Sequence, residues 1–219
     1  MEISAESSQP ANFSVLRRFM REKPLAERCE LCGTPLGPEH QHLVEPVNRR
    51  LVCSCDACAI LFEGQSSSKY RRVPRRIERL ADFRLTDLQW ESLHLPINLA
   101  FFYFSSPANR VIAMFPSPAG ATESLLPLES WNELAIDNPV LPELKPDVEA
   151  LLVNRVGEGR QYIRVPIDEC FKLVGLIRTH WRGLSGGTEV WREITRFFSS
   201  LNDRAITRGE DHARSEFQS

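Results

Sequence analysis

Two pairs of cysteines in the N-terminal third of the chain have the spacing of metal ligands. Cys29 and Cys32 form the first pair, and Cys55 and Cys58 form the second. Two intervening residues let both thiolates of a pair converge on one ion, and two such pairs complete the tetrahedral shell that zinc prefers. Gly33 follows the first pair, where a positive φ angle lets backbone amides point at the sulfur atoms. The spacing therefore predicts one metal ion bound by Cys29, Cys32, Cys55 and Cys58.

Three other side chains near these pairs are alternative donors. Cys53 precedes Cys55 by two residues, so on a strand both side chains would face the same side, and Cys53 remains an alternative metal ligand. Cys55 is preferred because it restores the CxxC spacing with Cys58. His40 and His42 lie between the two pairs. Because four thiolates already satisfy the ion, we interpret both histidines as solvent-facing residues of a hairpin.

A site closed by four thiolates leaves no position for water or substrate, which favours a structural metal over a catalytic one. We therefore expect that the chain is not an enzyme and that its metal module is a scaffold or a docking surface. Zinc is the expected ion. Iron is the alternative, because two CxxC turns around one iron would make a rubredoxin-like mono-iron electron-transfer protein. Ala59 stands where a second matching turn would carry glycine, and this weakens the iron alternative.

One strongly basic run, from Lys69 to Arg79, follows the cysteines. A basic run beside a zinc ribbon raises the alternative of a nucleic-acid-binding zinc-ribbon protein. Residues 24–63, however, carry three basic and six acidic side chains, a net charge of −3. Because contacts to phosphate need positive charge, nucleic acid is disfavoured as a partner. The alternative use of the run is contact with an acidic partner protein, and its candidate residues are Arg71, Arg72, Arg75 and Arg76.

The hydrophobic pattern divides the rest of the chain. We expect an N-terminal arm and short helix over residues 1–23, a zinc-ribbon-like metal module over 24–63, a linker over 64–69, an α+β domain over 70–201 and a disordered tail over 202–219. Within the domain, apolar runs bounded by turn residues predict strands over 97–104, 110–115, 148–153 and 161–165. Helical spacing of apolar residues predicts helices over 86–93, 129–135, 168–181 and 188–201. The fold class is therefore α+β, with a small zinc-ribbon-like β-hairpin module in front of a mixed α+β domain.

The bulk properties fit a small module joined to a medium-sized domain. The chain has 219 residues and a net charge of −2, so no global field draws it onto nucleic acid or an anionic membrane. The first dozen residues are polar, and the longest apolar run, over 95–104, is too short to span a bilayer. We therefore expect a cytoplasmic protein without a membrane span. In that setting clustered cysteines indicate metal ligands rather than disulfides. The sequence gives no indication of the oligomeric state.

A set of segments spread over residues 24–201 carries a family resemblance: ERCELCGTPL, HQHLVEPVNRRLVCSCDACAILF, YRRVPRRI, FPSPAGATESLL, NPVL, PDVEALLVNR, VPIDECFKLVGLIR and GLSGGTEVW. Together they resemble a bacterial family of uncharacterised proteins that is often encoded beside uptake [NiFe]-hydrogenase genes. The resemblance implies a non-catalytic accessory role in hydrogenase maturation or assembly, with hydrogenase subunits or maturation factors as protein partners. In that role the metal-bound ribbon would be the docking module. The resemblance transfers no catalytic residue.

Overall fold

The computed structural model describes residues 27–63, 69–157, 159–183 and 186–207. The arm and short helix expected over 1–23, most of the expected linker and residues 208–219 of the expected tail lie outside these ranges. Among the helices of the described ranges, none combines the length and the apolar character that crossing a membrane requires.

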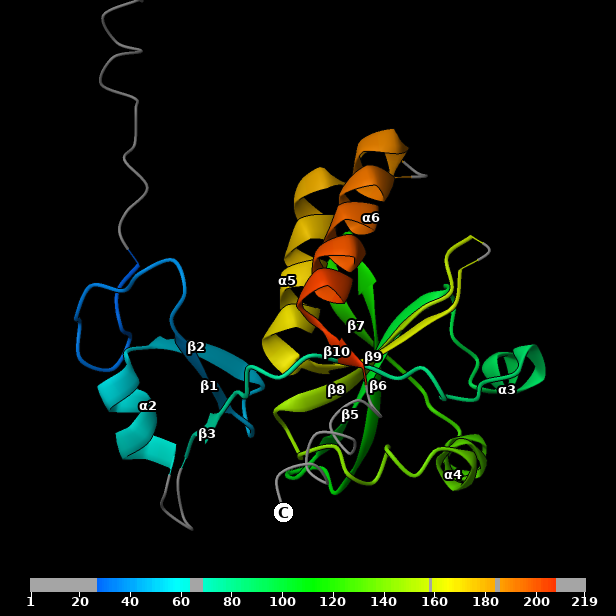
Figure 1. The fold of residues 1–219 in the computed structure, drawn as a ribbon, viewed down its shortest axis with the longest axis horizontal. Coiled ribbons are helices and arrows are strands. Elements are labelled where there is room, and N and C mark those ends of the chain that lie inside the picture. The colour runs from blue at the N-terminus through cyan, green and yellow to red at the C-terminus, as the bar shows by residue number, and fades with distance from the viewer. Residues whose placement is uncertain (1–26, 64–68, 158, 184–185, 208–219) are drawn as a thin grey trace, which may run out of the picture.

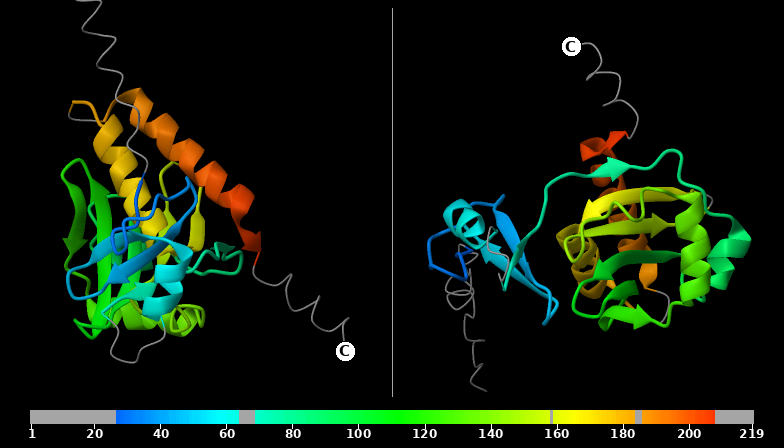
Figure 2. Two further views of the ribbon diagram at one scale, coloured as in Figure 1. Left: turned by 90° about the vertical axis from the view of Figure 1, so that its left-hand side faces the viewer. Right: turned by 90° about the horizontal axis from the view of Figure 1, so that it is seen from below.

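The first part of the structure is a small unit that contains all the clustered cysteines. A hairpin of β1 (Gln41–Glu45) and β2 (Arg50–Ser54) leads into α2 (Asp56–Glu63), and β3 (Arg71–Arg72) pairs with β1 on the side away from β2. We call residues 27–63 together with β3 the cysteine module. It lies beside the larger domain in Figures 1 and 2. Its own apolar core is small, with Leu43, Val52 and Ala59 as its fully packed members.

The larger domain is built on a seven-stranded sheet of order β10-β4-β9-β8-β5-β6-β7. All neighbouring strands are antiparallel except β10 and β4, which are parallel. The strands are β4 (Glu78–Arg79), β5 (Leu99–Ser105), β6 (Arg110–Ser117), β7 (Gly120–Ser124), β8 (Glu149–Asn154), β9 (Gln161–Pro166) and β10 (Ile206–Thr207). The helices are α3 (Asp87–Ser92), α4 (Leu128–Asp137), α5 (Ile167–His180) and α6 (Gly187–Arg204).

Helices cover both faces of this sheet, as Figure 1 shows. Alternate residues of a strand point to opposite faces, and along β5 Phe101 joins the core under α5 and α6 while Phe102 joins the core under α3 and α4. In β8, Leu152 likewise joins the core under α5 and α6, and Leu151 joins the core under α3 and α4. The central strands are therefore buried on both faces, which explains why they are continuous apolar runs in the sequence.

The module is attached to the domain through β1, which is also buried on two sides. Leu43 belongs to the small core of the module, whereas Val44 is part of the main core under α5 and α6. Polar contacts cross the same junction: Arg71 forms an ion pair with Asp147 at 2.9 Å, and His42 Nδ1 is hydrogen-bonded to Asp168 Oδ2 of α5 at 2.8 Å. The position of β1 between two cores fixes where the cysteines lie relative to the domain.

The α+β class predicted from the sequence is confirmed, and the four predicted strands and four predicted helices of the domain are β5, β6, β8, β9, α3, α4, α5 and α6. Thr86 caps α3, since its side chain accepts a hydrogen bond from the backbone N–H of Gln89. The structure differs at the predicted tail: α6 continues to Arg204, and β10 follows it. The backbone N–H of Ile206 donates to the Ile77 carbonyl, a contact that no local pattern could predict.

The turn between α5 and α6 gives a test of the packing. Gly186 has a φ angle of +86°, and a Cβ added to it would lie 2.8 Å from Val190 Cγ1 and 3.1 Å from the Trp181 ring. Gly186→Ala should therefore lower the free energy of unfolding by about 1–3 kcal/mol, through backbone strain and overpacking. Thermal or denaturant unfolding of the variant measures this loss.

Gly175→Ala is the matched control. Gly175 lies in the exposed interior of α5, where an added Cβ would meet nothing within 4 Å. This substitution should raise the free energy of unfolding by about 0.5–1 kcal/mol, because alanine loses less backbone entropy in a helix. Equal effects of the two substitutions would show that the turn is not packed as described.

Candidate metal centre

The first pair of cysteines lies on a tight loop before β1. The backbone N–H of Gly33 donates to the Cys29 carbonyl at 2.8 Å, and that of Cys29 donates to the Thr34 carbonyl at 2.8 Å. Gly33 has a φ angle of +75°, which other residues rarely adopt, so the glycine permits the sharp reversal that brings Cys32 back towards Cys29. The loop is the metal-binding knuckle that the CxxC spacing predicts.

The second pair lies at the start of a helix rather than on a second knuckle. Cys55 directly precedes α2, Cys58 lies in its first turn, and the backbone N–H of Cys58 is 3.4 Å from Cys55 Sγ. The positive end of the helix dipole and its free N–H groups favour a thiolate at this position. The order of elements is therefore knuckle, hairpin and helix, which differs from the two matching turns of a rubredoxin-like site.

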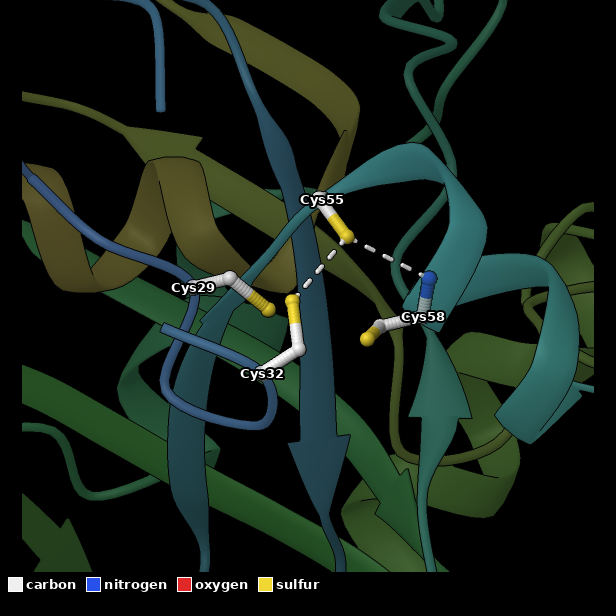
Figure 3. A group of neighbouring side chains, drawn as sticks. All are labelled: Cys29, Cys32, Cys55 and Cys58. Carbon is white, nitrogen blue, oxygen red and sulfur yellow. Dashed lines mark hydrogen bonds between the residues drawn. The ribbon is translucent and has the colours of Figure 1, made fainter. Parts of the chain in front are cut away.

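All four sulfur atoms converge, as Figure 3 shows, and lie within 4.8 Å of one another. Cys32 Sγ and Cys55 Sγ are 3.7 Å apart. Zn–S bonds of about 2.3 Å place the sulfur atoms of a regular tetrahedron about 3.8 Å apart, so the spacing suits one ion bound by four thiolates. We call Cys29, Cys32, Cys55 and Cys58 the tetrathiolate site. Cys29 and Cys58 are buried, whereas Cys32 is exposed.

The cysteines of the site differ in how readily they ionise without metal. Hydrogen bonds with the hydroxyl group and the backbone N–H of Thr34 lower the pKa of Cys32 to about 6. Burial, together with the neighbouring sulfurs, raises the pKa of Cys58 to about 12. At neutral pH the cluster alone therefore cannot hold four thiolates. A bound cation would supply the positive charge that stabilises them, so metal binding at this site must release protons.

The structure brings the four predicted ligands together and places Cys53 elsewhere. Cys53 Sγ lies with ring nitrogens of His40 and His42 in a second group of potential ligands. Burial raises the pKa of the Cys53 thiol, and Glu27 and Glu30 add to this effect. The interpretation of the histidines as solvent-facing is wrong for His40, whose side chain is only 8% exposed, and His42 is 28% exposed. The sequence does not show that the loop before β1 folds His40 inward.

The basic run does not form a free cationic surface. Arg71 pairs with Asp147 at 2.9 Å, Arg72 with Glu63 at 2.8 Å, and Arg76 with Glu78 at 3.4 Å. Arg75 is exposed. Because acidic side chains of the same chain neutralise most of these arginines, the run joins the module to the domain and offers little charge to a phosphate backbone.

The chain belongs to a family of unknown function (DUF5947), whose model matches residues 28–205. The match includes the knuckle, the hairpin, α2 and six strands of the seven-stranded sheet, all but β10, so the module and the domain belong to one family unit. No curated protein and no solved structure matches the chain.

The contact between Thr34 and Cys32 gives a test of the site. Thr34→Val removes the hydroxyl group 3.3 Å from Cys32 Sγ, which should raise the pKa of Cys32. Protons then compete better with metal, so the midpoint of metal release on acidification should move to higher pH, and affinity at neutral pH should fall roughly tenfold. The thiolate-to-metal absorption of the Co²⁺-loaded protein follows both quantities.

Thr195→Val is the control, because the Thr195 hydroxyl donates to the Trp191 carbonyl on α6, far from the cysteines in the sequence. It should leave the absorption and the release midpoint unchanged. Identical release curves for the two variants would contradict a role of Thr34 in holding the Cys32 thiolate.

Proposed function

We propose that this chain is a non-catalytic accessory protein whose cysteine module, held by one structural zinc ion, docks onto another protein. The family resemblance supports a [NiFe]-hydrogenase system as the setting, with hydrogenase subunits or maturation factors as the partners. The role would be in maturation or assembly, and the rest of the chain would be the scaffold that carries the module.

The four-thiolate shell supports the structural role of the metal. The protein supplies all four donors that a tetrahedral ion needs, so no position remains for water or substrate at this ion. The module also needs such an ion, because its own core is too small to stabilise about forty residues. Zinc fits this task because it has no redox chemistry and accepts a tetrahedral shell.

The observation that carries the docking role is a pair of exposed apolar side chains on α2. Ile60 and Leu61 are 66% and 64% exposed, and α2 is the helix whose first turn supplies Cys58 to the metal site. Apolar side chains presented on a rigid element mark a surface for protein contacts. Because both side chains are apolar, the matching partner surface would be apolar as well.

Surface variants test the docking role. Ile60→Asp combined with Leu61→Asp should weaken binding to the hydrogenase partner about tenfold or more, since two apolar contacts would be lost. Leu88→Asp is the matched control, because Leu88 is 77% exposed but lies on α3 of the domain. The measurement is recovery of the chain with affinity-tagged hydrogenase subunits, together with rescue of hydrogenase activity in a strain that lacks the gene.

The double variant should fail in both assays, whereas Leu88→Asp should behave as the unaltered chain. A deletion strain with normal hydrogenase activity and normal subunit processing would rule out the hydrogenase setting. Rescue by the double variant would rule out α2 as the docking surface.

A mono-iron electron carrier is the second candidate, and the exposure of Cys32 favours it, because a ligand sulfur at the surface shortens the path to a redox partner. The two candidates differ in colour. The proposed structural role predicts a colourless protein that contains zinc after anaerobic purification. A red protein with thiolate-to-iron absorption would support the electron carrier instead.

A further inference from the structure

A second group of potential metal ligands lies on the hairpin, apart from the tetrathiolate site. His42 and Cys53 are partners in the register of β1 and β2, so their side chains lie on the same face of the hairpin. His40, two residues before His42, contributes a ring whose centroid is 4.7 Å from that of His42. One ring nitrogen of each histidine and Cys53 Sγ lie within 4.8 Å of one another. We call these three residues the His₂Cys cluster.

Hydrogen bonds orient both rings for metal binding. His40 Nδ1 is 3.0 Å from the Gly37 carbonyl oxygen, and His42 Nδ1 is 2.8 Å from Asp168 Oδ2. Both partners are acceptors, so each ring donates from Nδ1 and keeps its lone pair on Nε2. Metal-binding histidines typically donate their second N–H to a carbonyl or a carboxylate in this way. The Asp168 carboxylate is itself fixed in position, because its Oδ1 accepts a hydrogen bond from the backbone N–H of Glu169.

His40 Nε2 is the observation that points to a ligand. The His40 side chain is only 8% exposed, and its Nε2 atom is buried without a hydrogen-bond partner in the described part of the chain. Buried polar atoms nearly always have a partner, so a buried nitrogen lone pair beside a second imidazole and a thiol needs one. A metal ion would accept that lone pair.

We propose that His40, His42 and Cys53 form a second metal site, which binds a divalent cation of the zinc class and keeps one coordination position open. Two imidazole nitrogens and one thiolate are a donor set that zinc accepts. Bonds of about 2.0–2.3 Å require donors about 3.3–3.6 Å apart, so the donor atoms, which lie within 4.8 Å of one another, need to close by at most about 1.5 Å. The fourth position is available to water or to a donor group of a partner, in contrast to the closed tetrathiolate site.

The surroundings of the cluster favour a cation. Glu27 Oε2 lies 3.4 Å from His40 Nδ1, Glu30 Oε1 accepts from the backbone N–H of Cys53 at 2.8 Å, and Asp168 lies behind His42. Arg50 pairs with Glu30. The carboxylates of Glu27 and Asp168 therefore remain to offset the positive charge of the metal ion. Because Asp168 lies in the first turn of α5, the site also lies at the junction between the module and the domain, and binding there would strengthen their contact.

Metal stoichiometry of the full-length chain tests this proposal. The reduced protein is stripped of metal and titrated with Zn²⁺ against a chromophoric chelator. The unaltered chain should bind two zinc ions, whereas His42→Gln and Cys53→Ser should each bind one. Cys170→Ser is the matched control, because Cys170 is a buried thiol in α5 outside both clusters, and it should still bind two ions. One ion in the unaltered chain, with the same affinity in every variant, would overturn the proposal.

X-ray absorption at the zinc edge of the unaltered chain supplies a measurement that needs no substitution. With both sites filled, imidazole nitrogens should appear beside sulfur in the zinc shell. A shell of sulfur alone at full loading would overturn the second site while leaving the tetrathiolate site, and the function proposed for it, intact. Two ions in His42→Gln would overturn the proposal as well, because they would show that His42 is not a ligand of the second ion.

Discussion

The convergence of four sulfur atoms between a loop and the N-terminus of α2 is the interaction on which the module depends. Among the residues that the structure describes, its own apolar core has three buried members, so hydrophobic burial alone does not hold the knuckle against the helix. The thiols without metal do not hold the knuckle against the helix either. Burial raises the pKa of Cys58 to about 12, which leaves the cluster partly protonated at neutral pH. A bound cation would reverse this balance by stabilising the thiolates, and the free energy of metal binding would then contribute to folding.

The module in turn depends on the domain. Because Leu43 and Val44 of β1 enter different cores, the hairpin cannot shift its register without exposing one of them. The ion pair of Arg71 with Asp147 and the hydrogen bond between His42 and Asp168 secure the same junction. This arrangement presents Ile60 and Leu61 on the helix whose N-terminal end carries the cysteines of the tetrathiolate site, which is the basis for the proposed docking role. It also places the His₂Cys cluster against the start of α5.

Local signals in the sequence were sufficient for much of this structure. The CxxC spacing predicted which four cysteines gather, and apolar runs predicted the central strands because β5 and β8 are buried on both faces. The signals failed where contacts distant in sequence decide the structure. The strand β7 has a small-residue sequence typical of a turn and forms because it pairs with β6. Burial of His40 depends on the fold of the loop before β1, and β10 depends on pairing with β4. The helical start of α2 was also missed, because a zinc-ribbon model expects a second turn there.

Hydrogen exchange of the full-length chain with and without metal tests the central claim most directly. If the tetrathiolate site organises the module, removal of metal by a chelator should speed amide exchange in β1, β2 and α2 by about 100-fold or more, whereas β5 and β8 should remain protected. Adding zinc back should restore the slow exchange. Exchange in α2 and the hairpin that is unaffected by metal removal would contradict the account, because the module would then be held together without the ion.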